Sequence, residues 1–358
     1  MYAALIITCI LIILGFCYRK SKFLFFIQGI WLWILIGFNS GGIDYDVNED
    51  IFLHSRKSLS FGEALTYIYE LFKDHNLDFY VYTAVTSLVA CIIIFGVIYK
   101  CSKNICLVAS LIYLYPGIDF VIQKRYFLCM SILFLAIQFL NKKGKKNKII
   151  YIILVLIASL CHSSALLYIV PFIFMFIPER YKYKIIIAMG IIGIIGSRYV
   201  SRIVSLIPFI SSNKVQLYFV ELSQNSNIVK FLFWCIWQLL FGLVIRKLYI
   251  WANGQAKMNK SLYDALALNI ELLCIMPFYA FDPTFTRLYR PVAIEDYMAA
   301  VSLLRNGRTQ FKTAFISTAS IVLLAVGSFF VFYIITGDWK DMYTTVFGNN
   351  IFLDWIKG

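Results

Sequence analysis

Apolar runs separated by short polar segments extend through almost the whole chain. Twelve such runs are predicted, at residues 2–17, 23–38, 78–99, 104–116, 121–140, 149–161, 164–177, 185–207, 229–250, 261–280, 287–304 and 313–336. A helix of about 20 apolar residues crosses a hydrocarbon core of about 30 Å, and several of the runs are shorter than that. We therefore expect an all-α fold: a polytopic integral membrane helical bundle of about 12 spans, including short broken helices. Residues 1–358 would form a single transmembrane domain.

The composition agrees with a membrane protein. Of the 358 residues, 61% are hydrophobic, against about 45 to 50% apolar content in soluble domains. The longest stretch without a strongly apolar run, residues 39–76, is too short to bury a core of its own. The first run is not typical of a signal peptide, because Arg19, Lys20 and Lys22 follow it instead of preceding it. We expect a retained first span with an external N-terminus.

The basic residues predict an orientation. The net charge is +14, and basic loops tend to stay on the cytoplasmic side of a membrane. The predicted spans place 20 of the 33 lysines and arginines on that side. The charge thus indicates topology and contact with membrane lipids, with no nucleic acid as partner. Residues 337–358 are expected outside, with Trp339 and Trp355 at the interface, so that both termini are external.

The apolar segment 149–177 is interrupted by polar residues at its centre. As one helix its 29 residues would measure about 43 Å, too long for one upright span. The sequence KKGKKNK precedes it and PERYKYK follows it, and a hairpin would leave both basic flanks in the cytoplasm. We therefore expect a broken-helix hairpin with His162 and Ser163 at its outer tip. One tilted span is the alternative, and it would invert everything downstream.

Residues 39–77 are expected to form an external loop with an unusual charge. With Asp78 they carry eight acids against three bases. Asp44, Asp46 and Asn48 begin like a calcium loop, but Glu49 replaces the required glycine and Ser55 the required glutamate, which excludes an EF-hand. A metal-diphosphate motif at Asp44-Tyr45-Asp46 stays open.

The same loop contains a predicted amphipathic helix at 61–72. Its apolar positions follow the spacing of one helical face, and they are Phe61, Ala64, Leu65, Ile68, Leu71 and Phe72. The helix would lie on the membrane surface or pack on the bundle.

Metal chemistry receives little support from the sequence. The nine cysteines form no CxxC pair and most lie in apolar runs, as small buried hydrophobic residues do. Cys161 and His162 lack a second cluster at ligand spacing, so we expect no metal site.

Three pairs of basic residues stand at the expected outer ends of spans. They are Lys124 and Arg125, Arg198 and Arg202, and Arg287 and Arg290. A guanidinium offers a planar fork that matches phosphate oxygens, so these residues are candidates for binding an anion. The alternative is that their side chains reach toward lipid head groups.

Three acids lie within apolar runs: Glu271, Glu295 and Asp296. Carboxylates in such places are either functional or paired. If these acids have only a structural role, we expect them to pair with Arg287 or Arg290.

The order of these features resembles the EpsG-like branch of the Wzy-type bacterial polysaccharide polymerases. The matching positions are Gly41, Gly42, Asp44 and Tyr45 in the early loop, Arg125 before the lysine-rich turn, His162, Ser163 and Ser164 at the hairpin tip, and Arg287, Tyr289 and Arg290 in the late segment. One departure is Tyr126 after Arg125, where such proteins often have glutamine.

The resemblance implies a membrane glycosyltransferase of GT-C-like architecture in the bacterial cytoplasmic membrane. It would join undecaprenyl-diphosphate-linked oligosaccharides into capsular, O-antigen or exopolysaccharide on the external face. No cofactor would be required, since the diphosphate is already an activated leaving group. A flippase and a chain-length regulator of the same pathway would be its protein partners.

Site roles follow from that chemistry. Arg125, Arg287 and Arg290, with Lys124, would bind the departing diphosphate. The base would be His162, whose ordinary pKa of about 6.5 suits proton transfer, or Asp44. The expected sugar contacts are Tyr45, Asp46, Ser163 and Tyr289.

Two other classes of protein remain open. A lipid-linked oligosaccharide flippase would also be basic and polytopic, but it should show an internal repeat, and none is visible. A membrane O-acyltransferase would need access to a cytoplasmic acyl donor, whereas the candidate residues collect on the expected external side.

Overall fold

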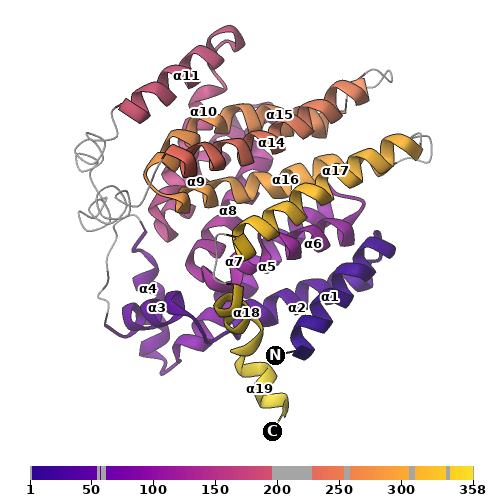
Figure 1. The fold of residues 1–358 in the computed structure, drawn as a ribbon. Coiled ribbons are helices and arrows are strands. Elements are labelled where there is room, and N and C mark those ends of the chain that lie inside the picture. The colour runs from indigo at the N-terminus through magenta and orange to yellow at the C-terminus, as the bar shows by residue number, and fades with distance from the viewer. Residues whose placement is uncertain are drawn as a thin grey trace. The chain divides into compact units, whose positions relative to one another are not determined.

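The computed structural model describes residues 2–54, 57, 62–195, 228–253, 259–305, 311–335 and 339–357 (Figure 1). Every regular element in these ranges is a helix, which confirms the all-α prediction. Arg198, Arg202 and much of the run expected at 185–207 lie outside the described residues.

The chain forms two compact units, each described by itself. The first unit comprises residues 1–58, 64–135 and 294–358, and the second comprises 59–63 and 136–293. The helices that begin in the first unit are α1 (Tyr2–Cys17), α2 (Lys22–Gly37), α3 (Ile43–His54), α4 (Leu65–Asp74), α5 (Phe79–Cys101), α6 (Ile105–Leu114), α7 (Gly117–Ile122), α8 (Lys124–Leu140), η6 (Ser302–Arg305), α17 (Phe311–Phe329), the π-helical η7 (Phe330–Ile335), α18 (Trp339–Gly348) and α19 (Ile351–Lys357). Those that begin in the second are α9 (Lys145–Cys161), η1 (Ser163–Tyr168), α10 (Ile169–Phe174), α11 (Glu179–Ile195), α14 (Ile228–Asn253), α15 (Lys260–Glu271), η4 (Leu272–Ala280), η5 (Pro283–Tyr289) and α16 (Arg290–Val301).

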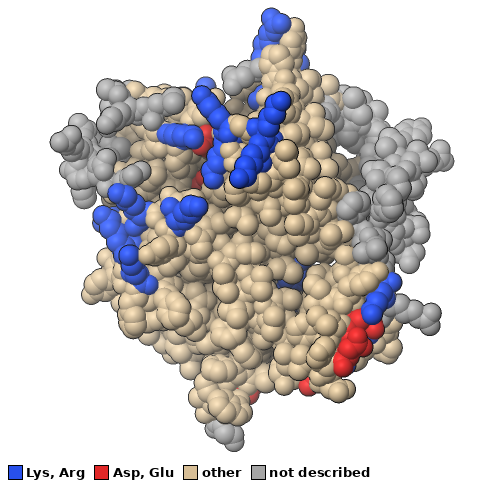
Figure 2. All heavy atoms as spheres, turned by 180° about the vertical axis from the view of Figure 1, so that it is seen from behind, with Lys and Arg blue, Asp and Glu red and all other residues tan. Residues whose placement is uncertain are grey.

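The helices have the length and surface of membrane spans. Among the described residues, four are long and apolar enough to cross a bilayer: Phe79–Cys101, Ile228–Asn253, Lys260–Ala280 and Phe315–Ile335. Four shorter apolar helices accompany them, at Tyr2–Cys17, Lys22–Gly37, Ile105–Leu114 and Ser163–Phe174. Most of the face shown in Figure 2 carries neither basic nor acidic side chains. Because such a surface suits lipid better than water, the chain is a helical membrane protein.

Buried polar side chains connect the first helices of the first unit. Gln28, which is fully buried, donates from Nε2 to the Leu11 carbonyl and to Ser110 Oγ, both at 3.1 Å. Gly15 makes room for it, since a Cβ there would lie 2.6 Å from Gln28 Nε2. Hydrogen bonds and small residues of this kind replace the hydrophobic effect between helices in lipid.

The helices break at residues 38–42, where the C-terminal segment supplies partners. The Ser40 N–H donates to the Asn349 carbonyl at 3.0 Å, and the Ile351 N–H donates to the Phe38 carbonyl at 2.9 Å. Asn39 Nδ2 donates to the Thr345 carbonyl at 2.5 Å. The C-terminal segment therefore fixes the backbone from which α3 begins.

The acidic loop contains two helices where the sequence predicted one. In α3, Tyr45 and Phe52 are buried, and this face was not predicted. The predicted amphipathic helix is α4, but it buries Leu65 and Tyr69 and exposes Ile68 and Leu71. The prediction treated tyrosine as polar, whereas the Tyr69 ring lies 5.4 Å from that of Phe52.

The second unit contains the turn at His162. After α9 ends at Cys161, the chain turns and continues as η1 and α10. The Tyr151 hydroxyl donates to the Tyr168 carbonyl at 2.5 Å, so the two arms lie side by side. In the basic segment after this turn, Lys182 Nζ lies 3.7 Å from Glu271 Oε1.

The close packing of Gly41 gives a test of the contact with the C-terminal segment. A Cβ at Gly41 would lie 2.6 Å from Asn349 Cβ, so Gly41→Ala should lower the free energy of unfolding by about 1–3 kcal/mol, the usual cost of overpacking. Thermal unfolding in detergent measures the effect. Asn349→Gly should restore part of the loss, and Gly96→Ala, which meets nothing within 4 Å, should cause none. Equal stability of Gly41→Ala and wild-type protein would contradict the contact.

Candidate functional site

The first cluster of candidate residues lies where the start of α8 meets α3. Lys124 Nζ donates to the Asn39 carbonyl and lies 4.6 Å from the centroid of the Tyr45 ring. Arg125 Nη1 donates to Asn48 Oδ1 at 3.4 Å. We call Asn39, Tyr45, Asn48, Lys124 and Arg125 the α3–α8 cluster. Its two basic side chains are half-buried and held next to an acidic helix.

The buried ring of Tyr45 supports this cluster. Its side chain is 8% exposed, and its ring packs on Phe79 with centroids 5.1 Å apart. Burial, and then the nearby carboxylates of Glu49 and Asp46, raise the pKa of Tyr45 to about 12. The ring therefore stays neutral and supports the Lys124 ammonium by a cation–π contact. It offers little surface on which a sugar could stack.

Asp44 and Asp46 stand on either side of Tyr45 in the first turn of α3. Both side chains are exposed, and carboxylates are stabilised near a helix N-terminus. The Asp44-Tyr45-Asp46 triplet thus divides into one buried ring and two accessible carboxylates.

The second cluster forms around His162, which joins α9 to η1. The Ser164 N–H donates to His162 Nδ1 at 3.4 Å, and Ser164 Oγ lies 2.8 Å from the same atom. A backbone N–H can only donate, so Nδ1 accepts, and the proton of the neutral imidazole lies on Nε2. In this arrangement Nε2 carries the N–H of the neutral ring. His162 and Ser163 are both half-buried.

A hydrogen bond connects the His162 turn to the arginine segment. The Tyr168 hydroxyl in η1 donates to the Leu288 carbonyl in η5. Arg287 and Arg290 flank this carbonyl in sequence and are 6% and 4% exposed. Guanidinium groups buried to this degree in an apolar bundle require polar partners, and they mark a polar interior.

Tyr289 lies between these arginines but faces the core. It is fully buried, with its ring 5.5 Å from those of both Trp237 and Phe241. Its hydroxyl donates to Asn269 Oδ1. No ring surface is left for a sugar, so the contact expected from the sequence would have to come from other residues.

Glu271 has a different partner from the one expected. Its carboxylate forms an ion pair with Lys182, and not with Arg287 or Arg290. The reason is the packing of α11 against η4, which brings the basic start of α11 to the end of α15. Asp296 is fully buried in α16.

Several residues that shape the site were not predicted. Asn48 orients Arg125, and Tyr168 ties the two parts of the second cluster. Elsewhere in the first unit, Asp119 is buried and accepts a hydrogen bond from the Tyr333 hydroxyl at 3.0 Å. Asn48 could have been predicted as a site residue from its alternation with Asp44 and Asp46. The Tyr168–Leu288 and Tyr333–Asp119 contacts could not, because they join segments that are distant in sequence.

The EpsG family matches residues 22–344, which include both clusters. No curated protein and no solved structure matches the chain. Because the match covers most of the sequence, the chain belongs to the EpsG family, a family of EpsG-like polysaccharide polymerases.

Proposed function

We propose that this protein is a membrane glycosyltransferase that polymerises oligosaccharide repeat units carried on undecaprenyl diphosphate. Membership of the EpsG family supports a membrane protein of the polysaccharide polymerase type. The proposal adds the lipid diphosphate donor, a multi-pass arrangement of about 12 spans with GT-C-like architecture, and a site on the external face of the bacterial cytoplasmic membrane. The product would be capsular, O-antigen or exopolysaccharide.

The observation that carries the proposal is the α3–α8 cluster. Lys124 and Arg125 are adjacent basic side chains whose positions are fixed by Asn39, Tyr45 and Asn48, and the Arg125 guanidinium is the permanent charge of the pair. Fixed cations stabilise charge that develops on a leaving group without reorganising during the reaction. A diphosphate gains such charge when it departs, and an arginine fork matches its oxygens.

The reaction proceeds by displacement at an anomeric carbon. A hydroxyl oxygen of one lipid-linked repeat unit forms a bond to the anomeric carbon of the growing chain. The bond from that carbon to the diphosphate oxygen breaks, and undecaprenyl diphosphate leaves with the electron pair. The hydroxyl proton passes to a general base.

Asp44 is the base in this scheme. Its carboxylate is exposed at the start of α3, whereas Nδ1 of His162 already accepts from Ser164. His162 therefore contributes the Nε2 N–H as a hydrogen-bond donor to a substrate oxygen. Asp46 and Ser163 contact the sugars, and Tyr45 acts by positioning Lys124.

Arg287 and Arg290 are the proposed anion-binding residues of the second unit. Their burial lowers the screening of their charge, which strengthens attraction to a phosphate. Tyr289 positions them through its packing on Trp237 and Phe241. No cofactor takes part, and the flippase and chain-length regulator of the same pathway are the proposed protein partners.

Arg125 provides the direct test of the clamp. Arg125→Ala should lower polymerisation by about 10²–10³-fold, the usual loss when one stabilising donor is removed. Arg125→Lys should restore only part of it, since an ammonium lacks the fork. Glycan length profiles from cells, normalised to the amount of protein in the membrane, give the measurement. Arg19→Ala, in an exposed loop of the same unit, is the matched control. Long polymer from Arg125→Ala at normal protein levels would rule out the clamp.

The His162 tautomer gives a second test. Glutamine can place an N–H near the position of Nε2, so His162→Gln should keep activity within about tenfold of wild type. His162→Ala should lose considerably more. If His162 were the general base, both variants would lose about 10²–10⁴-fold. Equal inactivity of the two variants, with unchanged thermal unfolding, would show that the donor assignment is wrong.

A further inference from the structure

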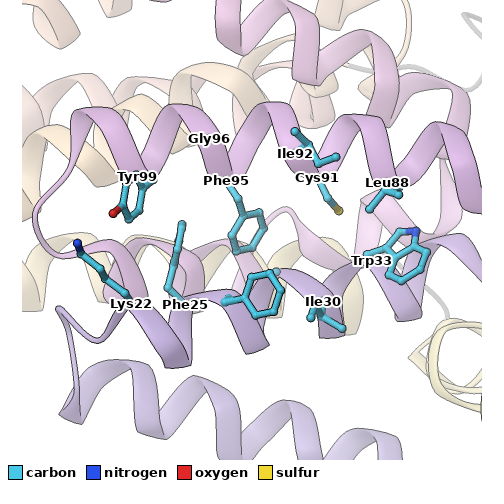
Figure 3. A pocket seen from close by; sticks show the side chains of 12 residues that line it. Lys22, Phe25, Ile30, Trp33, Leu88, Cys91, Ile92, Phe95, Gly96 and Tyr99 are labelled. Atoms are coloured by element: carbon cyan, nitrogen blue, oxygen red, sulfur yellow. The ribbon is translucent and has the colours of Figure 1, made fainter.

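An apolar groove lies between α2 and α5 in the first unit (Figure 3). Its cavity volume is about 370 Å³, within the range of sites that bind small molecules. The residues that shape its walls and floor are Phe25, Gly29, Trp33, Leu88, Phe95 and Gly96. Gly96 leaves the space open, because a Cβ there would meet no atom within 4 Å, whereas a Cβ at Gly29 would lie 3.1 Å from the Phe95 ring.

The groove has the length of one leaflet of a bilayer. Lys22 and Tyr99 are at one end, and Trp33 and Leu88 are at the other. Eleven residues separate the ends on each helix, which corresponds to about 16 Å at 1.5 Å per residue. Half of a hydrocarbon core of about 30 Å is nearly the same length. A single fatty acyl chain from one leaflet therefore fits the groove lengthwise.

One end of the groove is basic. Lys22 Nζ lies 5.6 Å from the centroid of the Tyr99 ring. The Cys106 N–H donates to the Arg19 carbonyl at 3.1 Å, so the loops after α1 and after α5 meet at this end. These segments carry five bases, namely Arg19, Lys20, Lys22, Lys100 and Lys103, and residues 1–43 and 79–118 contain no acid. The end at Lys22 thus attracts a negatively charged group.

We propose that this groove binds one anionic phospholipid. One acyl chain lies between α2 and α5 along Gly29 and Gly96, and the phosphate lies at the Lys22 ammonium. The basic end of the groove favours an anionic phospholipid over a zwitterionic one, since each basic residue at a membrane surface strengthens attraction to anionic head groups. The groove is distinct from the α3–α8 cluster in its residues and chemistry. A lipid here would hold α2 and α5 together where their side chains leave space.

Native mass spectrometry of the purified full chain tests the proposal. The detergent-solubilised protein is titrated with phosphatidylglycerol or with phosphatidylcholine of the same acyl chains. Wild-type protein should retain one phosphatidylglycerol at least tenfold more tightly than phosphatidylcholine. Gly96→Leu should lower this binding at least tenfold by filling the groove, and Lys22→Gln should remove the preference for the anionic lipid.

A matched variant separates filling of the groove from a general effect of a larger side chain. A Cβ added at Gly327 in α17 would also meet no atom within 4 Å, so Gly327→Leu should bind phosphatidylglycerol as wild type does. Unchanged binding by Gly96→Leu, or equal retention of the two lipids by wild-type protein, would overturn the proposal. Displacement of phosphatidylglycerol by equimolar undecaprenyl phosphate would also overturn it, since that result would identify a polyisoprenoid as the occupant.

Discussion

Backbone groups away from water need partners within the protein, and this requirement governs the structure. Helices satisfy it along most of the described chain, but regular α-helix is interrupted at 38–42, at 162 and between 272 and 289, where the chain forms the 3₁₀ helices η4 and η5. At the first break the partners come from residues 345–351. At the second, His162 accepts from the Ser164 N–H. At the third, Gln238 donates to the Leu272 carbonyl at 3.1 Å, and Asp282 accepts from the Thr284 N–H at 2.7 Å.

The candidate residues lie at or beside these breaks. Irregular backbone is tolerated at membrane depth only where protein or a polar cavity surrounds it, so such places are also where polar side chains can be held for chemistry. The break at 38–42 supplies the Asn39 carbonyl that receives Lys124. The break at 162 places the Ser164 N–H 3.4 Å from His162 Nδ1. In each unit, hydrogen bonds that satisfy a break therefore also hold residues of the proposed site.

Much of the fold could be predicted from the sequence, because apolar runs and basic loops report directly on helices in a membrane. The inward face of α3 could not be predicted, because Tyr45 and Phe52 stand among acids in the sequence. Their burial comes from contact with Phe79 in α5. The candidate residues were found from their types and order, but their roles needed geometry. Tyr289 illustrates the difference, because only the structure shows its ring enclosed by Trp237 and Phe241.

The most direct measurement is reconstitution of the purified protein with a synthetic undecaprenyl-diphosphate repeat unit as sole substrate, followed by mass analysis of the glycan. The account predicts a ladder that rises by whole repeat units, with undecaprenyl diphosphate released in equal amount and no nucleotide added. Recovery of the native repeat unit unchanged, from protein that is folded and inserted in the membrane, would contradict it.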